Sequence, residues 1–300
     1  MKFIRTCPRK GLSFAHVHTR LIQYKRFRME NILTQSFFLS AGETNPEQEM
    51  SVPVLVSKII DVATLHANSL GIGNPAMVGL RAGWVLSRLS LEINRWPAVN
   101  ETYSLSTWIE SFNRHFSERA FALCDNEGRV LGHARSVWMV MGVDSHENVG
   151  LSHLSLPEDM IRGERVPIAR QKRHQLIFPI DADSLPAGAL RADRPTSYYT
   201  FKYTDLDSYR HVNTVRYVEL LLNQFSLEDF DSDSVRRLEL SFLHEARYGM
   251  KTGIYRLDSR ERGVLADGSE AAVSSFSLVD ASDSSPFLYA RICLAPRDGV

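Results

Sequence analysis

The sequence predicts an α+β protein made of two similar halves, each an antiparallel sheet wrapped against its own long helix. A strand, a polar loop, a long helix and several strand-like runs occur in that order twice along the 300 residues. Residues 88–93 are echoed by residues 237–242, at an offset of 149. Hydrophobic residues make up 44% of the chain and charged residues 23%, which is typical of a folded domain rather than a disordered one.

The first half is predicted to open with a strand from Met29 to about Ser40, followed by a polar loop to Met50. A helix is expected over residues 52–71, where apolar positions recur at helical spacing. Pro53 suits its first turn, and glycines suit its end. The helix signals are Leu55, Ile59, Val62, His66 and Leu70, closed by Gly71 and Gly73. Strands are then expected from about residue 83 to 93 and over 102–112, 115–125 and 129–143, with a hairpin turn at 126–128.

Residues 144–195 are predicted to connect the halves, because prolines and charges interrupt them, with one short helix near 157–162. The second half repeats the first: a strand at 197–203, a polar loop at 204–210 and a helical run from Val212 to Phe225. Its later strands are expected at 235–244, 252–259, 270–280 and 287–295. The predicted domains are therefore residues 29–155 and 196–300, joined by a linker over residues 156–195.

The first 28 residues hold eight of the 35 basic residues and none of the 35 acidic ones, so the remainder has a net charge of −8. They lack the apolar core of a secretory signal. We interpret them as a misassigned start upstream of Met29, with an organelle transit peptide as the alternative. The expected location is cytoplasmic, or an organelle stroma or matrix in the second case. Three widely spaced cysteines fit a reducing compartment.

Charge and hydropathy exclude other classes. The formal net charge of zero does not favour a nucleic-acid partner, and no apolar run approaches the ~20 residues of a membrane span. The cysteine spacing excludes a four-cysteine zinc site, and no phosphate-binding loop or nucleophile elbow occurs.

The densest polar cluster runs from Tyr203 to Asn213, at the entry to the second predicted helix. Free amides at a helix start can stabilise a carbonyl oxygen that becomes negative. Asp207 and His211 lie four residues apart, close enough to meet if the loop curls into the first turn. Glu245 ends a predicted strand and is expected to face the same site. A carboxylate beside an imidazole can activate water.

Simpler roles stay open for these residues. Taken alone, Asp205, Asp207 and Asn213 favour helix capping over catalysis, because Asp and Asn satisfy free helix amides. A divalent-metal site made by Asp205, Asp207 and Glu245 has only weak support from such loose spacing, so no metal is predicted.

The sequence resembles the acyl-acyl carrier protein thioesterases, in the bacterial branch related to the plant plastid enzymes, over roughly residues 30–295. The resemblance lies in residues 83–93, 107–108 and 134–138 of the first half, and in residues 205–217 and 245–249 of the second.

This resemblance implies a tandem hotdog fold, whose first half shapes an acyl pocket and whose second half is catalytic. It implies hydrolysis of an acyl carrier protein thioester, with no metal or organic cofactor, by a monomer or homodimer. Asp207, His211 and Glu245 fall on the family's catalytic aspartate, histidine and glutamate. The substrate-binding residues expected beside them are Tyr209, Val212 and Asn213, with amides near Val212 stabilising the oxyanion.

Two positions depart from the family pattern. Tyr209 stands where the family usually has an asparagine, and a phenol cannot mimic both ends of an amide. Ala246 stands where plant members often have a cysteine, which excludes a covalent cysteine mechanism here. Acyl carrier protein is acidic, so docking needs basic residues. The candidates are Arg210, Arg216, Arg236, Arg237 and Arg247.

Two other functions remain as alternatives: an acyl-coenzyme A thioesterase of the same superfamily, and a catalytically weakened hotdog that only binds acyl groups. Tyr209 supports the second alternative, whereas three titratable groups in one place count against it.

Overall fold

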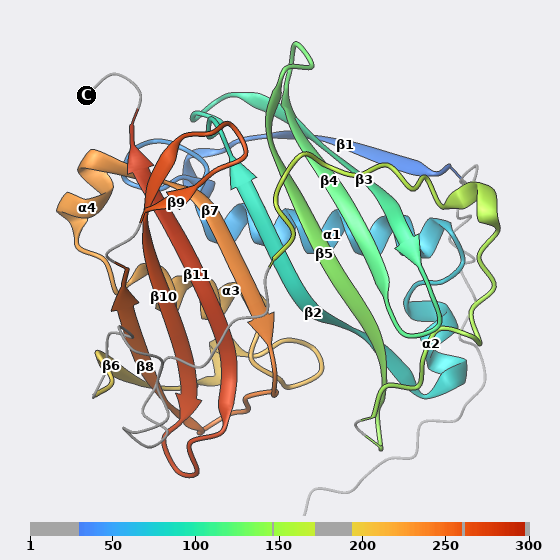
Figure 1. The fold of residues 1–300 in the computed structure, drawn as a ribbon. Coiled ribbons are helices and arrows are strands. Elements are labelled where there is room, and N and C mark those ends of the chain that lie inside the picture. Colours follow the sequence, from blue (N-terminus) through green and yellow to red (C-terminus); the bar gives the residue numbers. More distant parts are fainter. Residues whose placement is uncertain (1–29, 146, 172–193, 260–261, 298–300) are drawn as a thin grey trace, which may run out of the picture.

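One antiparallel sheet runs through both halves of the chain in the computed structural model, which describes residues 30–145, 147–171, 194–259 and 262–297 (Figure 1). Its strands are β1 (Ile32–Phe38), β2 (Ala82–Ile93), β3 (Thr102–Phe112), β4 (Ser117–Asp125), β5 (Val130–Gly142), β6 (Ser197–Thr200), β7 (Asp233–Phe242), β8 (Lys251–Asp258), β9 (Gly263–Val264), β10 (Glu270–Asp280) and β11 (Pro286–Pro296). Their order is β1-β3-β4-β5-β2-β7-β11-β10-β8-β6, and β9 pairs with β10. The predicted extension over residues 1–28 lies outside the described residues, and so do residues 172–193 of the predicted linker.

Four helices accompany the sheet in the described ranges: α1 (Val52–Ser69), α2 (Asn74–Leu80), α3 (Thr214–Leu222) and α4 (Leu227–Ser232). Single 3₁₀ turns occur at Ala41–Glu43, Glu158–Met160 and Tyr203–Asp205. The α+β class is confirmed, as is the order of strand, loop, long helix and strands in each half. The predictions missed α2 and α4. Gly73, expected to close α1, is the N-cap of α2. The helical run predicted to reach Phe225 ends at Leu222, and α4 begins at Leu227.

The two halves meet where β2 pairs with β7, the strands that carry the sequence echo. Leu89 lies opposite Leu240, and Ser90 lies opposite Glu239. Ser90 and Glu239 are themselves separated by the repeat offset of 149, so a local twofold axis passes between them. The strand order reads the same from both ends of the sheet under this symmetry. The echo therefore marks the seam that joins two predicted sheets into one.

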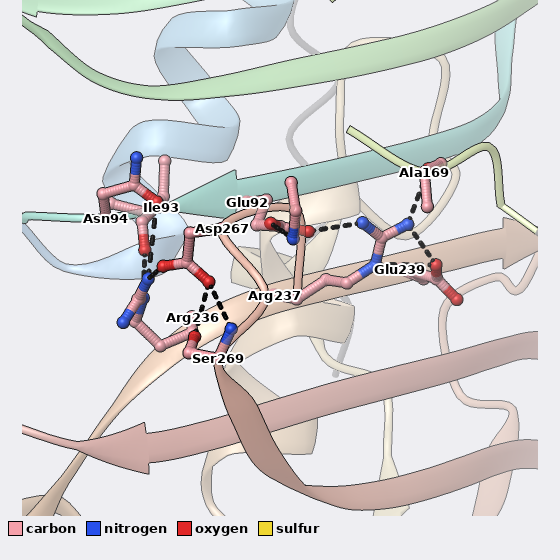
Figure 2. Close-up of polar contacts among 10 residues, drawn as sticks. Glu92, Ile93, Asn94, Ala169, Arg236, Arg237, Glu239, Asp267 and Ser269 are labelled. Carbon is pink, nitrogen blue, oxygen red and sulfur yellow. Dashed lines mark hydrogen bonds and ion pairs between the residues drawn. The ribbon is translucent and has the colours of Figure 1, made fainter. Parts of the chain in front are cut away.

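A buried ionic cluster ties this seam together on the sheet face away from α1 (Figure 2). Arg237 on β7 donates to Glu92 on β2 at 2.6 Å, to Glu239 at 2.6 Å and to the carbonyl oxygen of Ala169 at 2.7 Å. Glu92 also accepts from the amide of Ala266 at 2.5 Å. A segment of the predicted linker and a segment of the second half thus cover the outer face of β2. This cover explains why Glu92 is buried.

The core lies where α1 and α3 pack together against one face of the sheet (Figure 1). Leu55, Ile59 and Val62 of α1 are buried there with Val218 of α3. Burial of a side chain of this size contributes about 1.5–3 kcal/mol, so the apolar stripe of α1 accounts for its position. Among the described residues, no helix combines the length and hydropathy needed to cross a bilayer.

Candidate active site

The loop over residues 203–213, called here the second-half loop, is a tight turn organised by one carboxylate. Oδ1 of Asp207 accepts hydrogen bonds from the amide of Tyr209 at 2.8 Å and from the amide of His211 at 3.1 Å. The amide of Asp207 in turn donates to the carbonyl oxygen of His211 at 2.8 Å. Arg210 closes the turn in the left-handed region, with φ 66°. Oδ2 of Asp207 forms no hydrogen bond within the described residues, so it remains available to a substrate or a water molecule.

His211 and Glu245 come into direct contact across this turn. Nε2 of His211 lies 3.1 Å from Oε2 of Glu245, and both side chains are partly exposed. Glu245 follows the end of β7 by three residues rather than ending the strand. Its neighbour Ala246 accepts a hydrogen bond from the amide of Val212 at 2.9 Å, which holds the two segments together. The fold therefore gathers Asp207, His211 and Glu245 at one place, as the sequence predicts.

Asp205 connects the second-half loop to β6 and to α3. Its side chain is 1% exposed, and its Oδ2 accepts from the hydroxyl of Tyr199 at 3.0 Å and from the amide of Lys202 at 2.7 Å. Oδ1 lies 2.8 Å from Nε of Arg216 on α3. Asp205 therefore accepts from the amide that begins the 3₁₀ turn Tyr203–Asp205 and does not cap α3, whose N-cap is Asn213. Within the described residues no group of three His, Cys, Asp or Glu side chains fits a metal ion.

The helix-entry amides differ from the expectation. The amide of Val212 donates to Ala246, and the amide of Asn213 donates to the carbonyl oxygen of Asp205 at 2.8 Å. Neither is free to donate to an oxyanion. The amide of Thr214, the first residue of α3, forms no hydrogen bond with any described residue. Thr214 therefore replaces Val212 as the candidate oxyanion donor.

Tyr209 and Asn213 lie at the rim. Tyr209 is 56% exposed, so its ring lies largely in solvent. Asn213 caps α3, with its Oδ1 accepting from the amide of Val215 at 2.9 Å. Its side-chain oxygen is therefore committed to the helix.

Tyr217 is a residue that the sequence analysis did not assign. Its hydroxyl accepts a hydrogen bond from the amide of Ala246 at 3.3 Å, directly beside Glu245. Burial raises the pKa of Tyr217, so the phenol stays neutral. The only sequence signal was its place on the buried face of the helix.

The candidate docking arginines separate into two groups. Arg237 is buried in the seam cluster, so it cannot contact a carrier protein, and Arg236 is largely covered and paired with Asp267 at 2.7 Å. Arg216 is paired with Asp205. Arg210 and Arg247 are exposed beside the site and form no ion pair with a described residue. These two remain the candidates.

The first half carries a counterpart of this loop at residues 41–51, called here the first-half loop. Oδ1 of Asn45 accepts from the amide of Glu49 at 2.8 Å, as Asp207 does from His211, and Gln48 has φ 62°. The amide of Met50 donates to Pro97 at 2.8 Å, as Val212 does to Ala246. Three positions thus correspond by geometry: Asn45 to Asp207, Glu49 to His211, and Trp96 to Glu245. The first half therefore has none of the aspartate, histidine and glutamate that the second half carries at these three positions.

A cavity of about 540 Å³ lies beside the first-half loop. The end of α3 and α4 line its far side, together with Phe225, Ser226 and Phe230. Arg297 closes its edge by donating to Glu49 at 2.6 Å and to the carbonyl oxygen of Phe230 at 2.9 Å.

Two family models match the chain. The acyl-ACP thioesterase N-terminal domain matches residues 30–152, and the acyl-ACP thioesterase C-terminal domain matches residues 189–274. A chloroplastic acyl-[acyl-carrier-protein] hydrolase of Cuphea viscosissima is 26% identical, over 71% of this chain and 52% of that protein. An oleoyl-acyl carrier protein thioesterase of Arabidopsis thaliana is 25% identical, over 71% of this chain and 60% of that protein.

Solved structures share the fold. An acyl-ACP thioesterase from Bacteroides thetaiotaomicron has a TM-score of 0.75 at 24% identity, covering 88% of this chain and 98% of that one. The 12:0-ACP thioesterase from Umbellularia californica has a TM-score of 0.71 at 19% identity, covering 90% and 96%. These likenesses confirm the predicted tandem hotdog fold. The chain spans only about half the length of the first curated relatives that it matches.

Proposed function

The chain belongs to the acyl-ACP thioesterase family, and on that premise we propose that it hydrolyses the thioester of a fatty acyl-acyl carrier protein to a free fatty acid and the carrier thiol, in fatty acid biosynthesis. One observation carries the proposal: Nε2 of His211 lies 3.1 Å from Oε2 of Glu245, beside the free carboxylate oxygen of Asp207. Acid–base groups gathered at a helix start suit attack of water on a carbonyl.

The proposed reaction needs only groups of this chain and water. A carboxylate of Asp207 or Glu245 takes a proton from water, and the hydroxide formed attacks the thioester carbon. The carbonyl oxygen becomes an oxyanion, which the amide of Thr214 stabilises. The carbon–sulfur bond then breaks, and the thiolate leaving group takes a proton from the active-site acid. His211 orients Glu245 through their contact.

The geometry also supports acyl carrier protein as the partner. Arg210 and Arg247 are exposed on the rim of the site, whereas the chain beyond residue 28 has a net charge of −8. Two cations beside the thioester suit an acidic carrier more than an uncharged one, and they act mainly on the association rate.

The test is thiol release from acyl-carrier-protein thioesters of medium to long chain length, with the same chains on coenzyme A assayed in parallel. We expect turnover on the carrier protein that collapses in His211→Asn. Turnover on coenzyme A alone overturns the choice of carrier. Binding without turnover on either carrier overturns the enzyme assignment and supports an acyl-binding protein.

The setting of this reaction is part of the proposal. We place it in the cytoplasm, or in an organelle stroma or matrix if residues 1–28 act as a transit peptide, and in a monomer or homodimer. Fractionation of cells expressing the full chain tests the location, and light scattering of the purified chain tests the oligomeric state.

A further inference from the structure

Arg119 on β4 is a buried cation with no anionic partner among the described residues. Its side chain is 4% exposed and points from the sheet toward α1. Its single hydrogen bond runs from Nη1 to Nδ1 of His66 on α1, at 2.9 Å. A buried charge without a counter-ion is costly, so this guanidinium needs a further explanation.

His66 does not compensate the charge. A guanidinium can only donate, so Nδ1 of His66 accepts and Nε2 carries the proton, which it donates to the carbonyl oxygen of Glu30 at 3.0 Å. Burial and the nearby Arg119 lower the pKa of His66 to about 4, so the ring is neutral. Burial lowers the pKa of Arg119 to about 10, which leaves it charged at neutral pH.

Arg119 lines a small cavity between α1, α2 and the sheet. The volume is about 30 Å³, which admits one or two water molecules or a group of similar size. Trp84 and Trp138 form its apolar walls, and Thr64 and Asn74 line it with hydroxyl and carboxamide groups. Neither of these two side chains forms a hydrogen bond to a described residue, so three hydrogen-bonding groups line one space, which opens to solvent at the exposed Asn74.

The repeat relates the position of this cavity on α1 to a position just beyond the end of α3. Ala63 and Thr64 lie as far beyond the N-cap of α1 as Phe225 and Ser226 lie beyond the N-cap of α3. Phe225 and Ser226 line the large cavity that faces the first-half loop. This correspondence predicts that the cavity at Thr64 lies on the side of α1 toward the second-half loop, although α1 continues to Ser69 whereas α3 ends at Leu222.

We propose that this cavity is a carboxylate subsite, in which Arg119, Thr64 and Asn74 bind the terminal carboxylate of a dicarboxylic acyl chain. The planar guanidinium fork matches a carboxylate, and the cavity admits a group of that size. The assignment of the carboxylate to an acyl chain rests on the proposed thioesterase function. A free short-chain acid carries the same group, and the experiment separates the two sources.

The experiment compares acyl-carrier-protein thioesters of matched medium length that end either in a methyl group or in a carboxylate. The ratio of kcat/KM for the carboxylate over the methyl chain is measured for the full chain and for Arg119→Met. We expect the ratio to fall about tenfold to hundredfold in the variant, as for the loss of a charged hydrogen bond. Arg129→Met, at an exposed arginine of the neighbouring hairpin, leaves the ratio unchanged.

A second measurement follows the thermal midpoint of both proteins in acetate, against chloride at equal ionic strength. A midpoint raised by acetate in the full chain alone, with an unchanged substrate ratio, supports the subsite and assigns it to a free acid. An unchanged ratio together with no Arg119-dependent acetate effect overturns the proposal. If Arg119→Met does not fold, Thr64→Val and Asn74→Ala carry both measurements.

Failure of the proposed function gives a different result. Normal hydrolysis of methyl-terminated chains without any carboxylate effect overturns the subsite and leaves the thioesterase intact. Absence of hydrolysis on every chain overturns the thioesterase, and the acetate measurement still decides whether Arg119 binds a carboxylate.

Discussion

The contact between His211 and Glu245 is the feature at residue scale on which the proposed chemistry depends. Glu245→Gln keeps the shape of the side chain but removes its charge and its capacity to take a proton. We expect kcat to fall about a hundredfold or more, since general acid–base groups contribute that much, with a smaller change in KM. Steady-state thiol release measures both constants.

Glu270→Gln is the matched control, because Glu270 is an exposed glutamate paired only with Arg262, at 3.5 Å. Its kcat should equal that of the unchanged chain. A Glu245→Gln enzyme with full kcat would remove Glu245 from the reaction.

His66 makes stability depend on pH. Its pKa is lowered from 6.5 to about 4 in the folded state, so the unfolded chain binds the proton more tightly. The contribution of neutral His66 to the free energy of unfolding is complete above pH 6.5. It is lost as the pH falls toward 4, and the full loss is about 3 kcal/mol. Urea unfolding across this range measures the effect.

His66→Gln provides the comparison, because an amide can accept from Arg119 and donate to Glu30 without titrating. The difference in unfolding free energy between the two proteins should vary with pH in this window. A difference that stays constant from pH 7 to pH 4 contradicts a buried neutral His66.

Residue-level predictions succeeded where the side chain itself carries the signal. The spacing of Asp207 and His211 and the place of Glu245 at the end of a predicted strand indicate that the three side chains meet, and the family resemblance adds their proposed roles. The oxyanion donor expected near Val212 stays a prediction. It moves to the amide of Thr214, because the amide of Val212 itself donates to Ala246, a contact that the sequence does not show. Arg119 and His66 gave no signal, since their meeting depends on the packing of β4 against α1.

At the scale of elements, each of the two loops is held in place by one carboxylate, Asp205 or Glu43, but only the second-half loop carries the proposed chemistry. Asp205→Asn should remove the charge that balances Arg216, costing about 3 kcal/mol of unfolding free energy, and should also lower kcat because the loop carries His211. Glu43 anchors the first-half loop in the same way, through Ser40 and Lys58.

Glu43→Gln is therefore the control for the loop. It should lower stability by about 1 kcal/mol, as for loss of one hydrogen-bonded group, and leave kcat unchanged. Chemical unfolding and thiol release on both variants test this. An equal loss of kcat in the two variants would assign the effect to general loosening of the sheet.

Long elements followed from periodicity, and short ones did not. The bounds of β3 and β10 agree with the predicted strands, and Pro53 begins α1 as expected. The helices α2 and α4 span seven and six residues, too few for a helical period to stand out. Gly73 and the end of the run at Phe225 looked like stops, whereas in the fold they border further helices.

At the scale of the whole molecule, the seam cluster joins the halves. Arg237→Met leaves Glu92 and Glu239 buried without their shared cation, so we expect a loss of about 3–5 kcal/mol of unfolding free energy. Arg262→Met, at an exposed pair, should change it little. Urea unfolding followed by circular dichroism measures both, and equal midpoints would contradict the role of the cluster.

The sequence predicts the two halves but does not predict that their strands join into one sheet. The echo of residues 88–93 at 237–242 indicates a repeat. In the structure the two echoed segments also pair with each other, and this pairing makes one sheet. The pairing of two edge strands cannot be recognised from their side chains, because backbone groups form its hydrogen bonds. Glu92, Arg237 and Glu239 alternate with apolar residues, a pattern that indicates a solvent-facing side, so the sequence does not predict that this face is covered.

The proposed hydrolysis depends on side chains of the second-half loop and on none of the first-half loop. Asp207→Asn and Asn45→Asp test this directly, because each swap preserves the side-chain oxygen that closes its turn. The measurement is kcat/KM for release of carrier-protein thiol from one medium-chain substrate. We expect a loss of about a hundredfold or more in Asp207→Asn and full activity in Asn45→Asp. Full activity in Asp207→Asn, or equal losses in the two variants, would contradict the account.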